Sequence, residues 1–415
     1  MHTKGASRIA LFGAVLLAAG TPAAENTADT ALDAFKNGDP GLEFRLRFEL
    51  VDQDNFAADG RALTLRSRLN FRTAPWRNLQ AFVEFDDVST LGVDQFNGSF
   101  GTTPGREQFP VIADPSDTRL NQAYLDFTPY AGFKLRGGRQ RLQFDNDRFV
   151  GNVGWRQNEQ IYDAGGVIFE PHPDWRVLYD YVFNVNRIFG NDVPAGDHEH
   201  NTHLVNITRR ITADHQLTGY FYRIDNNDAA ALSNRTAGLR YTGKIALAGG
   251  RSLALTGEYA HQNDAAQNPA DFSADYWRGD IAWTFDPLLT LSAGYEVLAG
   301  DVTPGGAFRT PLATLHAFNG WADQFLNTPD SGIEDLFFGL GGKWQRLNWQ
   351  IVWHRFDPEI GGGDFANELD AQLNVSLYKG ISLLVKTAIF DASRDDQAGN
   401  FVDVTKFWTM LSARF

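Results

Sequence analysis

Residues 41–72 alternate between apolar and charged side chains with a period of two, and this pattern constrains the fold most. In GLEFRLRFEL the leucines and phenylalanines fall on one face of an extended strand, and the arginines and glutamates fall on the other. After the polar segment DQDNFAADGR, the alternation returns in ALTLRSRLNFR. These two segments predict a β-hairpin. The hairpin alone fits a soluble sandwich and a transmembrane barrel with a wet, charged lumen about equally well.

The N-terminus has the features of a secretory signal peptide. Two basic residues precede the apolar run IALFGAVLLAA, and small residues follow in GTPAA, so cleavage is expected after Ala23 or Ala24. The predicted division of the chain is a signal peptide at 1–24, a short periplasmic leader at 25–40, with a possible helix at ALDAF, and a transmembrane barrel at 41–415.

The composition excludes several classes of protein. The sequence contains no cysteine, so disulfides and thiolate metal sites are excluded. The formal net charge of -14 argues against a nucleic-acid partner. Beyond the signal peptide, no stretch approaches the roughly 18 uninterrupted apolar residues of a transmembrane helix. A mean hydropathy of -0.32 suits a barrel, which averages lipid-facing apolar residues against lumen-facing polar ones.

The remaining strand patterns bring the expected total to about eighteen, and the connecting segments alternate between short and long. Short connections include TADH and YKG, whereas long ones lie near 88–119, 142–159, 185–202 and 299–332. Bacterial outer-membrane barrels have short periplasmic turns, long extracellular loops and an even number of strands. A soluble sandwich has no reason to sort its loops in this way.

The C-terminal segment KFWTMLSARF supports the same fold. Its apolar face ends on Phe415, and a terminal aromatic residue on an amphipathic last strand is typical of outer-membrane assembly signals. Antiparallel pairing with residues 42–50 would close the barrel and remove both edges. The predicted fold is an all-β, antiparallel transmembrane barrel of about 18 strands in the outer membrane of a Gram-negative bacterium.

The segment GGRQRLQFDNDRFVGNVGWRQNEQIYD has the highest density of arginine. Strict alternation would direct Arg139 and Arg141 into lipid, at a cost of about 2–4 kcal/mol each near the midplane. We expect a β-bulge at Gly137–Gly138 to bring both into the lumen instead. The segment that follows is long enough to fold back into the lumen with Arg148 and Arg156.

The charged side chains predicted to line the pore and bind substrate are Arg45, Arg47, Arg66, Arg68, Glu84, Asp86, Arg139, Arg141, Arg148 and Arg156. As a ring, the arginines would attract carboxylates through charge and forked hydrogen bonds. Alternatively they pair with acids such as Glu43 and Glu49 as a structural ladder. The two interpretations are compatible, and both remain open at this point.

Other polar motifs carry little chemical information. GDHEHNTH places His198, His200 and His203 in one expected outer loop, which we interpret as solvated rather than metal-binding. Two Asp-x-Asp pairs, in VDQDN and FDNDR, lack the spacing of a calcium loop. No nucleophile elbow, phosphate loop or zincin helix occurs, so we expect neither an enzyme nor a cofactor.

With these residues in view, the chain resembles the alginate export family of outer-membrane proteins. The resemblance is carried by RLRFELVDQDNF, TLRSRLNFRT, GRQRLQFDNDRFVGNVGWRQNEQIYDA, and FNGWADQF with the following EDLFFG. It implies an eighteen-stranded diffusion channel for an anionic polysaccharide, with an arginine-rich constriction set against a few acids. The candidates that it implies are Arg45, Arg47, Arg66, Arg68, Arg148 and Arg156.

A general anion-selective uptake porin is the main alternative, and a surface receptor or adhesin acting through acidic loops is a third. The expected partners are anionic polysaccharide or small carboxylate solutes, outer-membrane lipid and lipopolysaccharide, and the barrel assembly machinery.

Overall fold

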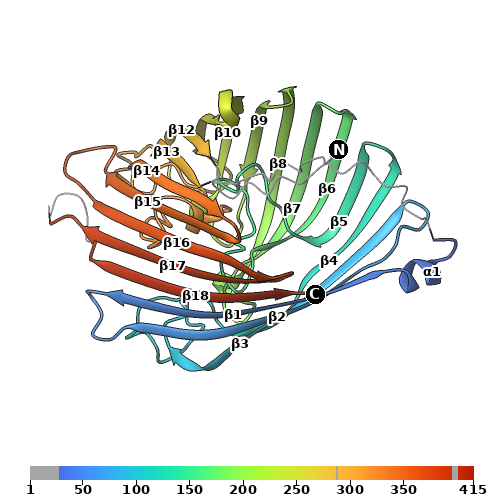
Figure 1. Cartoon of the computed structure of the whole chain (residues 1–415), viewed down its shortest axis with the longest axis horizontal. Coiled ribbons are helices and arrows are strands. Elements are labelled where there is room, and N and C mark those ends of the chain that lie inside the picture. Colours follow the sequence, from blue (N-terminus) through green and yellow to red (C-terminus); the bar gives the residue numbers. More distant parts are fainter. Residues whose placement is uncertain (1–27, 287, 395–400) are drawn as a thin grey trace.

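The computed structural model describes residues 28–286, 288–394 and 401–415, so the predicted signal peptide lies outside the described residues. The strands form one 18-stranded antiparallel sheet in which each strand pairs with its sequence neighbours. Because β1 also pairs with β18, the sheet closes on itself, as Figure 1 shows. The predicted eighteen-stranded barrel is therefore confirmed.

The strands are β1 (Asp39–Gln53), β2 (Gly60–Arg72), β3 (Leu79–Gln95), β4 (Asp117–Tyr130), β5 (Phe133–Gln140), β6 (Ile161–His172), β7 (Trp175–Asn186), β8 (Asp197–Thr212), β9 (His215–Ile224), β10 (Asn234–Ala246), β11 (Ser252–Asp264), β12 (Ser273–Asp286), β13 (Leu289–Leu298), β14 (Ile333–Trp344), β15 (Leu347–Asp357), β16 (Ala366–Tyr378), β17 (Ile381–Ala392) and β18 (Val404–Arg414). The helices are α1 (Ala31–Lys36) and the single-turn 3-10 helices η1 (Pro194–Gly196), η2 (Ala230–Leu232), η3 (Ala248–Gly250) and η4 (Leu315–Ala317). None of the helices in the described part of the chain is long and apolar enough to cross a membrane.

The helix α1 coincides with the ALDAF segment. Thr30 caps it by accepting a hydrogen bond from the Asp33 backbone N–H at 3.1 Å. The Phe35 ring lies 5.0 Å from the Phe71 ring of β2, and the Ala74 N–H donates to the Ala34 carbonyl at 2.9 Å. These contacts hold α1 against the turn that joins β2 and β3, outside the barrel wall (Figure 1).

The barrel closes where the sequence predicted, between β1 and β18. The pairing runs continuously from Glu43 opposite Arg414 to Gln53 opposite Val404. Beyond it, the Phe415 N–H donates to the Leu42 carbonyl at 2.9 Å, so the terminal residue also joins the ladder. Both edges are thus paired, as a sheet in lipid requires.

The connections are sorted as expected, with two-residue turns such as 213–214 and 379–380 at one end and long loops at the other. The predicted boundaries near 88–119 and 185–202 were wrong, however. β3 continues to Gln95 because it stays paired with β2, and β8 begins at Asp197 because it pairs with β7. Backbone pairing extends these strands through residues of weak β-propensity.

Alternation along each strand separates an outer apolar face from a polar inner face. Leu69, Leu125 and Phe338 are 56%, 57% and 51% exposed on the outer face. In a membrane barrel this face meets lipid. Trp175 and Trp344 lie at strand ends beside short turns, where an aromatic girdle is expected.

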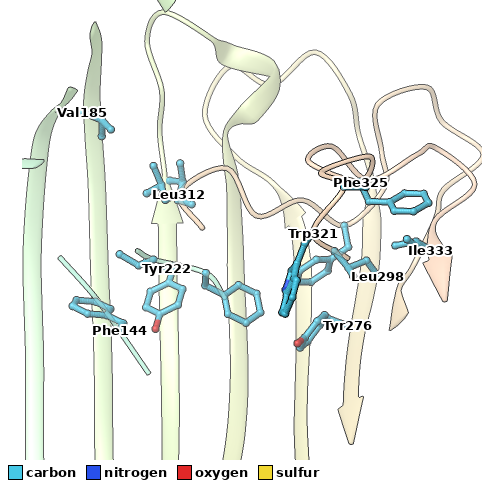
Figure 2. Close-up of a cluster of buried hydrophobic side chains, with 14 of the residues drawn as sticks. Phe144, Val185, Tyr222, Tyr276, Leu298, Leu312, Trp321, Phe325 and Ile333 are labelled. Carbon is cyan, nitrogen blue, oxygen red and sulfur yellow. The ribbon is translucent and has the colours of Figure 1, made fainter. Parts of the chain in front are cut away.

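The loops 141–160 and 299–332 enter the barrel and pack against its inner wall. Figure 2 shows Leu312, Trp321 and Phe325 of loop 299–332 among the same buried side chains as the strand residues Tyr222 and Tyr276. All five belong to one buried hydrophobic cluster. Burial of these side chains stabilises the loops inside the barrel.

Candidate pore constriction

Loop 141–160 is attached to the inner wall by two arginines. Arg148 pairs with Glu296 of β13 at 2.8 Å, whereas Arg156 pairs with Glu49 of β1 at 3.4 Å and with Asp323 of loop 299–332 at 2.8 Å. All of these side chains are buried. This loop, which is long enough to fold back, therefore lies inside the barrel against its wall.

Loop 299–332 is attached to β16 through its backbone. The Ala322 N–H donates to Glu368 at 2.7 Å, and the Trp321 N–H donates to Asp370 at 3.1 Å. Gly320 precedes them with φ of 81°, and a Cβ there would lie 2.2 Å from a Glu368 oxygen. Glycine therefore permits the close approach in the motif FNGWADQF.

Two arginines of the β1–β2 hairpin lie beneath loop 141–160 and pair with acids. Arg66 forms an ion pair with Glu43, and Arg68 donates two hydrogen bonds to Asp86, at 2.5 and 2.6 Å. Only 1% of Arg66 and 5% of Arg68 is exposed. The expectation of a wet lumen at these positions is therefore wrong, because the loop covers them.

Arg47 is covered in the same way and is 1% exposed. It pairs with Glu49 at 3.2 Å and with Asp114 of loop 96–116 at 3.4 Å. It also donates to the Trp155 carbonyl at 2.7 Å. The ion pairs that the ladder interpretation requires are thus present, and they join loops 96–116 and 141–160 to the hairpin.

Arg45 differs from its neighbours because its contacts with the loop are all to carbonyl groups. Its Nη1 donates to the carbonyls of Gly154, at 3.0 Å, Trp155, at 3.4 Å, and Arg156, at 3.2 Å. Among the residues that the structure describes, no carboxylate lies within ion-pairing distance of Arg45. Its charge therefore stays uncompensated by direct contact.

The expected bulge at Gly137–Gly138 is absent, because β5 pairs in continuous register with β6 from Phe133 to Gln140. Gly138 has φ of 129°, but the ladder is not shifted there. The shift in pairing register lies instead between β3 and β4, where β4 carries one extra residue opposite Glu84 and Phe85 of β3.

Without the bulge, the side chains of Arg139 and Arg141 lie on different sides of the barrel wall. Arg139 keeps the phase of Gly137 and pairs with its cross-strand neighbour Asp163 at 2.8 and 2.9 Å, so it does not enter the lumen. Arg141 follows the end of β5, where alternation no longer applies. It donates to Glu84 and to Glu159, each at 2.5 Å, and joins the lumen network.

Aromatic rings and cations fill the space between the two loops. His316 stacks on Trp155 with centroids 4.3 Å apart and planes at 4°. The Lys386 ammonium lies 3.6 Å from the Trp321 ring centroid and 4.2 Å from that of Trp155. Such cation–π contacts are strongest where water is excluded, so they help to hold the loops together.

The loop carboxylates in this network are held in their charged forms. Burial by itself would raise the pKa of Glu159, but Arg141, Arg68 and Arg66 outweigh it and hold that pKa well below its usual value. Burial likewise opposes the charge of Asp323, whose pKa is nevertheless well below its usual value because His316, Lys406 and Arg156 surround it. Both groups therefore remain ionised at neutral pH.

Several important side chains escaped the sequence analysis. Lys386 of β17 and Lys406 of β18 both reach the network, and Lys406 pairs with Asp323 at 3.0 Å. Alternation places Lys406 on the face opposite to Phe407, so the sequence contained a signal for it. Glu159 and Asp323 lie on loops, where no period indicates which way a side chain points.

The histidine-rich segment lies on β8 rather than in an outer loop. His198 and His200 are buried on one face, whereas His203 contacts Tyr179 at 2.9 Å on the other. Within the described ranges, no group of three or more histidine, aspartate or glutamate side chains could hold a metal ion.

Comparisons with known proteins identify the family of this chain. The family model described as "Alginate export" matches residues 38–321, more than half of the chain. This chain belongs to the alginate export family. It is accordingly an outer-membrane channel protein and not an enzyme. A comparison with curated proteins found no match.

Solved structures support the same fold. OccAB2 of Acinetobacter baumannii has a TM-score of 0.70 at 14% identity, over 91% of this chain and 98% of that one. OccK1 (OpdK) of Pseudomonas aeruginosa has a TM-score of 0.70 at 11% identity, over 92% and 99%. Another structure of that protein, described as the outer membrane protein opdK, has a TM-score of 0.68 at 12% identity, over 91% and 98%.

Proposed function

We propose that this alginate export family channel conducts anionic, carboxylate-bearing saccharides by diffusion. The observation that carries the proposal is the uncompensated charge of Arg45. Arg47, Arg66 and Arg68 are neutralised by acids, whereas Arg45 contacts only carbonyl groups of the loop and remains partly exposed. Its side chain borders a cavity of about 380 Å³ at the periplasmic end of the barrel.

The attraction of anions to this entrance depends on local charge and not on the net charge of the protein. Charges beyond about 8 Å are largely screened at physiological salt, so acids in the outer loops contribute little at the periplasmic entrance. Glu43 lies beside the same cavity, but Arg66 and Arg414 both pair with it. The nearby charge is therefore positive, which attracts carboxylates.

Replacing Arg45 by glutamine should lower anion preference, and replacing it by glutamate should lower it further or reverse it. The physical reason is the loss of a guanidinium at the cavity that has no carboxylate partner. The measurement is the reversal potential in a potassium chloride gradient across a planar bilayer.

Arg61→Gln is the matched control, because Arg61 lies on the same hairpin but is exposed and pairs with Asp59 at 2.8 Å. It removes the same charge and should leave the reversal potential nearly unchanged. A cation-selective wild-type channel, or equal effects of Arg45→Gln and Arg61→Gln, would contradict the proposal.

The second candidate function is a general anion-selective uptake porin. It is favoured by the loops that fill much of the lumen beside β1 and β2, because a narrow path suits small solutes better than polymers. Flux of a monomeric uronate without flux of its oligomers, in vesicles containing the purified protein, would support this alternative.

A further inference from the structure

The cavity of about 380 Å³ at the periplasmic end is lined by hydroxyl groups as well as by Arg45. Ser376 of β16, Ser382 of β17 and Ser412 of β18 all border it. Ligand sites in proteins occupy roughly 300–1,000 Å³, so this volume suits a small saccharide segment.

The three serines form a single row across the inner wall. Ser376 lies directly opposite Ser382, and Ser382 lies directly opposite Ser412. Ser412 in turn lies opposite Arg45 of β1. Because residues opposite one another share a face, and Arg45 faces the lumen, the whole row does so. Adjacent strands are about 4.8 Å apart, so the row is roughly 14 Å long.

The polar groups of this row are available to a ligand. In the described part of the chain, none of the three serine hydroxyls takes part in a side-chain hydrogen bond, and all three are at least partly exposed. The Arg45 Nε is buried and lacks a hydrogen-bond partner. Buried polar groups without partners are rare, and such a donor indicates a ligand or water position.

A charged group and several hydroxyl groups lie together at this part of the inner wall. The Glu43 carboxylate at the same cavity forms ion pairs with Arg66 and Arg414, so it does not repel an anion strongly. A carboxylate-bearing sugar requires a cation for its carboxylate and donors or acceptors for its ring hydroxyls.

We propose that this cavity is a periplasmic-side subsite for a uronate-like saccharide, in which Arg45 pairs with a ring carboxylate and Ser376, Ser382 and Ser412 hydrogen-bond the ring hydroxyls. The subsite rests on the proposed function and adds to it the place where the saccharide first contacts the barrel. An exported saccharide meets this end of the channel first.

The test uses the full-length barrel in a planar bilayer, with trigalacturonate added on the periplasmic side. The concentration that blocks half of the ionic current is measured for the wild type and for the triple variant Ser376→Ala, Ser382→Ala and Ser412→Ala. Each neutral hydrogen bond changes affinity roughly two- to tenfold, so the triple variant should need at least about ten times more trigalacturonate.

Thr208→Ala is the matched control, because Thr208 is an inward hydroxyl of β8, about halfway around the barrel, where it contacts Thr218 at 3.1 Å. It should block at the wild-type concentration. Cellotriose, a neutral three-ring probe, should block the wild type more weakly than trigalacturonate, and Arg45→Gln should remove that difference. Slower migration of unboiled protein on a gel would identify a variant that has failed to fold, and single Ser→Ala variants would then be used.

The two proposals fail in different ways. An anion-selective wild type that trigalacturonate blocks at the same concentration as the triple serine variant would overturn the subsite and leave the proposed function standing. A cation-selective wild type that trigalacturonate does not block would overturn both.

Discussion

The double change Phe407→Arg and Leu411→Arg is expected to abolish accumulation of the folded barrel in the outer membrane. Both side chains lie on the outer face of β18, where Phe407 is 36% and Leu411 40% exposed to the lipid. An arginine on the lipid face costs about 2–4 kcal/mol near the midplane, so two together approach the whole stability of a typical protein, about 5–15 kcal/mol. This loss of stability destabilises β18, the strand that closes the barrel by pairing with β1.

The measurement is outer-membrane yield at matched synthesis, together with faster gel migration of the unboiled protein. Thr405→Arg is the control, because Thr405 lies on the same face of the same strand but near its outer end, where the cost of arginine falls to about 0–1 kcal/mol. Normal yield of the double variant would refute the assignment of β18 as the closing strand.

Replacing Arg156 by glutamine is expected to raise single-channel conductance several-fold. Arg156 links Glu49 of the wall to Asp323 of the second loop, and all three side chains are buried. Removing one partner of a buried ion pair costs about 3–5 kcal/mol, because a desolvated charge is left behind. We therefore expect loop 141–160 to leave the wall and the path beside β1 to widen.

Arg156→Lys keeps the charge and should keep most of the wild-type conductance. A second control is Arg106→Gln, which removes the partly exposed pair between Arg106 of loop 96–116 and Asp94 of β3. Exposed pairs contribute roughly 0–1 kcal/mol, so this change should leave conductance as it was. Conductance of Arg156→Gln equal to that of the wild type would show that the loop does not limit the pore.

The barrel fold could be predicted from local features of the sequence alone. The two-residue period in strands such as β1 and β18, the sorted loop lengths and the terminal Phe415 are properties of neighbouring residues. In a membrane, every backbone N–H and C=O must be paired, so this period permits few structures other than a closed barrel. Strand number, closure between β1 and β18, and the inward direction of Arg45, Arg47, Arg66 and Arg68 were all predictable for this reason.

The tertiary structure alone decided how the charges are used. Alternation indicates the face on which Arg66 lies, but not that loop 141–160 covers it or that Glu43 neutralises it. The partners Glu159 and Asp323 come from loops without periodicity, and they reach Arg68 and Lys406 of the wall through contacts distant in sequence. The bulge prediction failed because the register of β5 depends on its neighbours β4 and β6, and not on Gly137–Gly138 alone. The free charge of Arg45 is likewise a property of the assembled lumen, where desolvation and pairing are set by residues more than a hundred positions away.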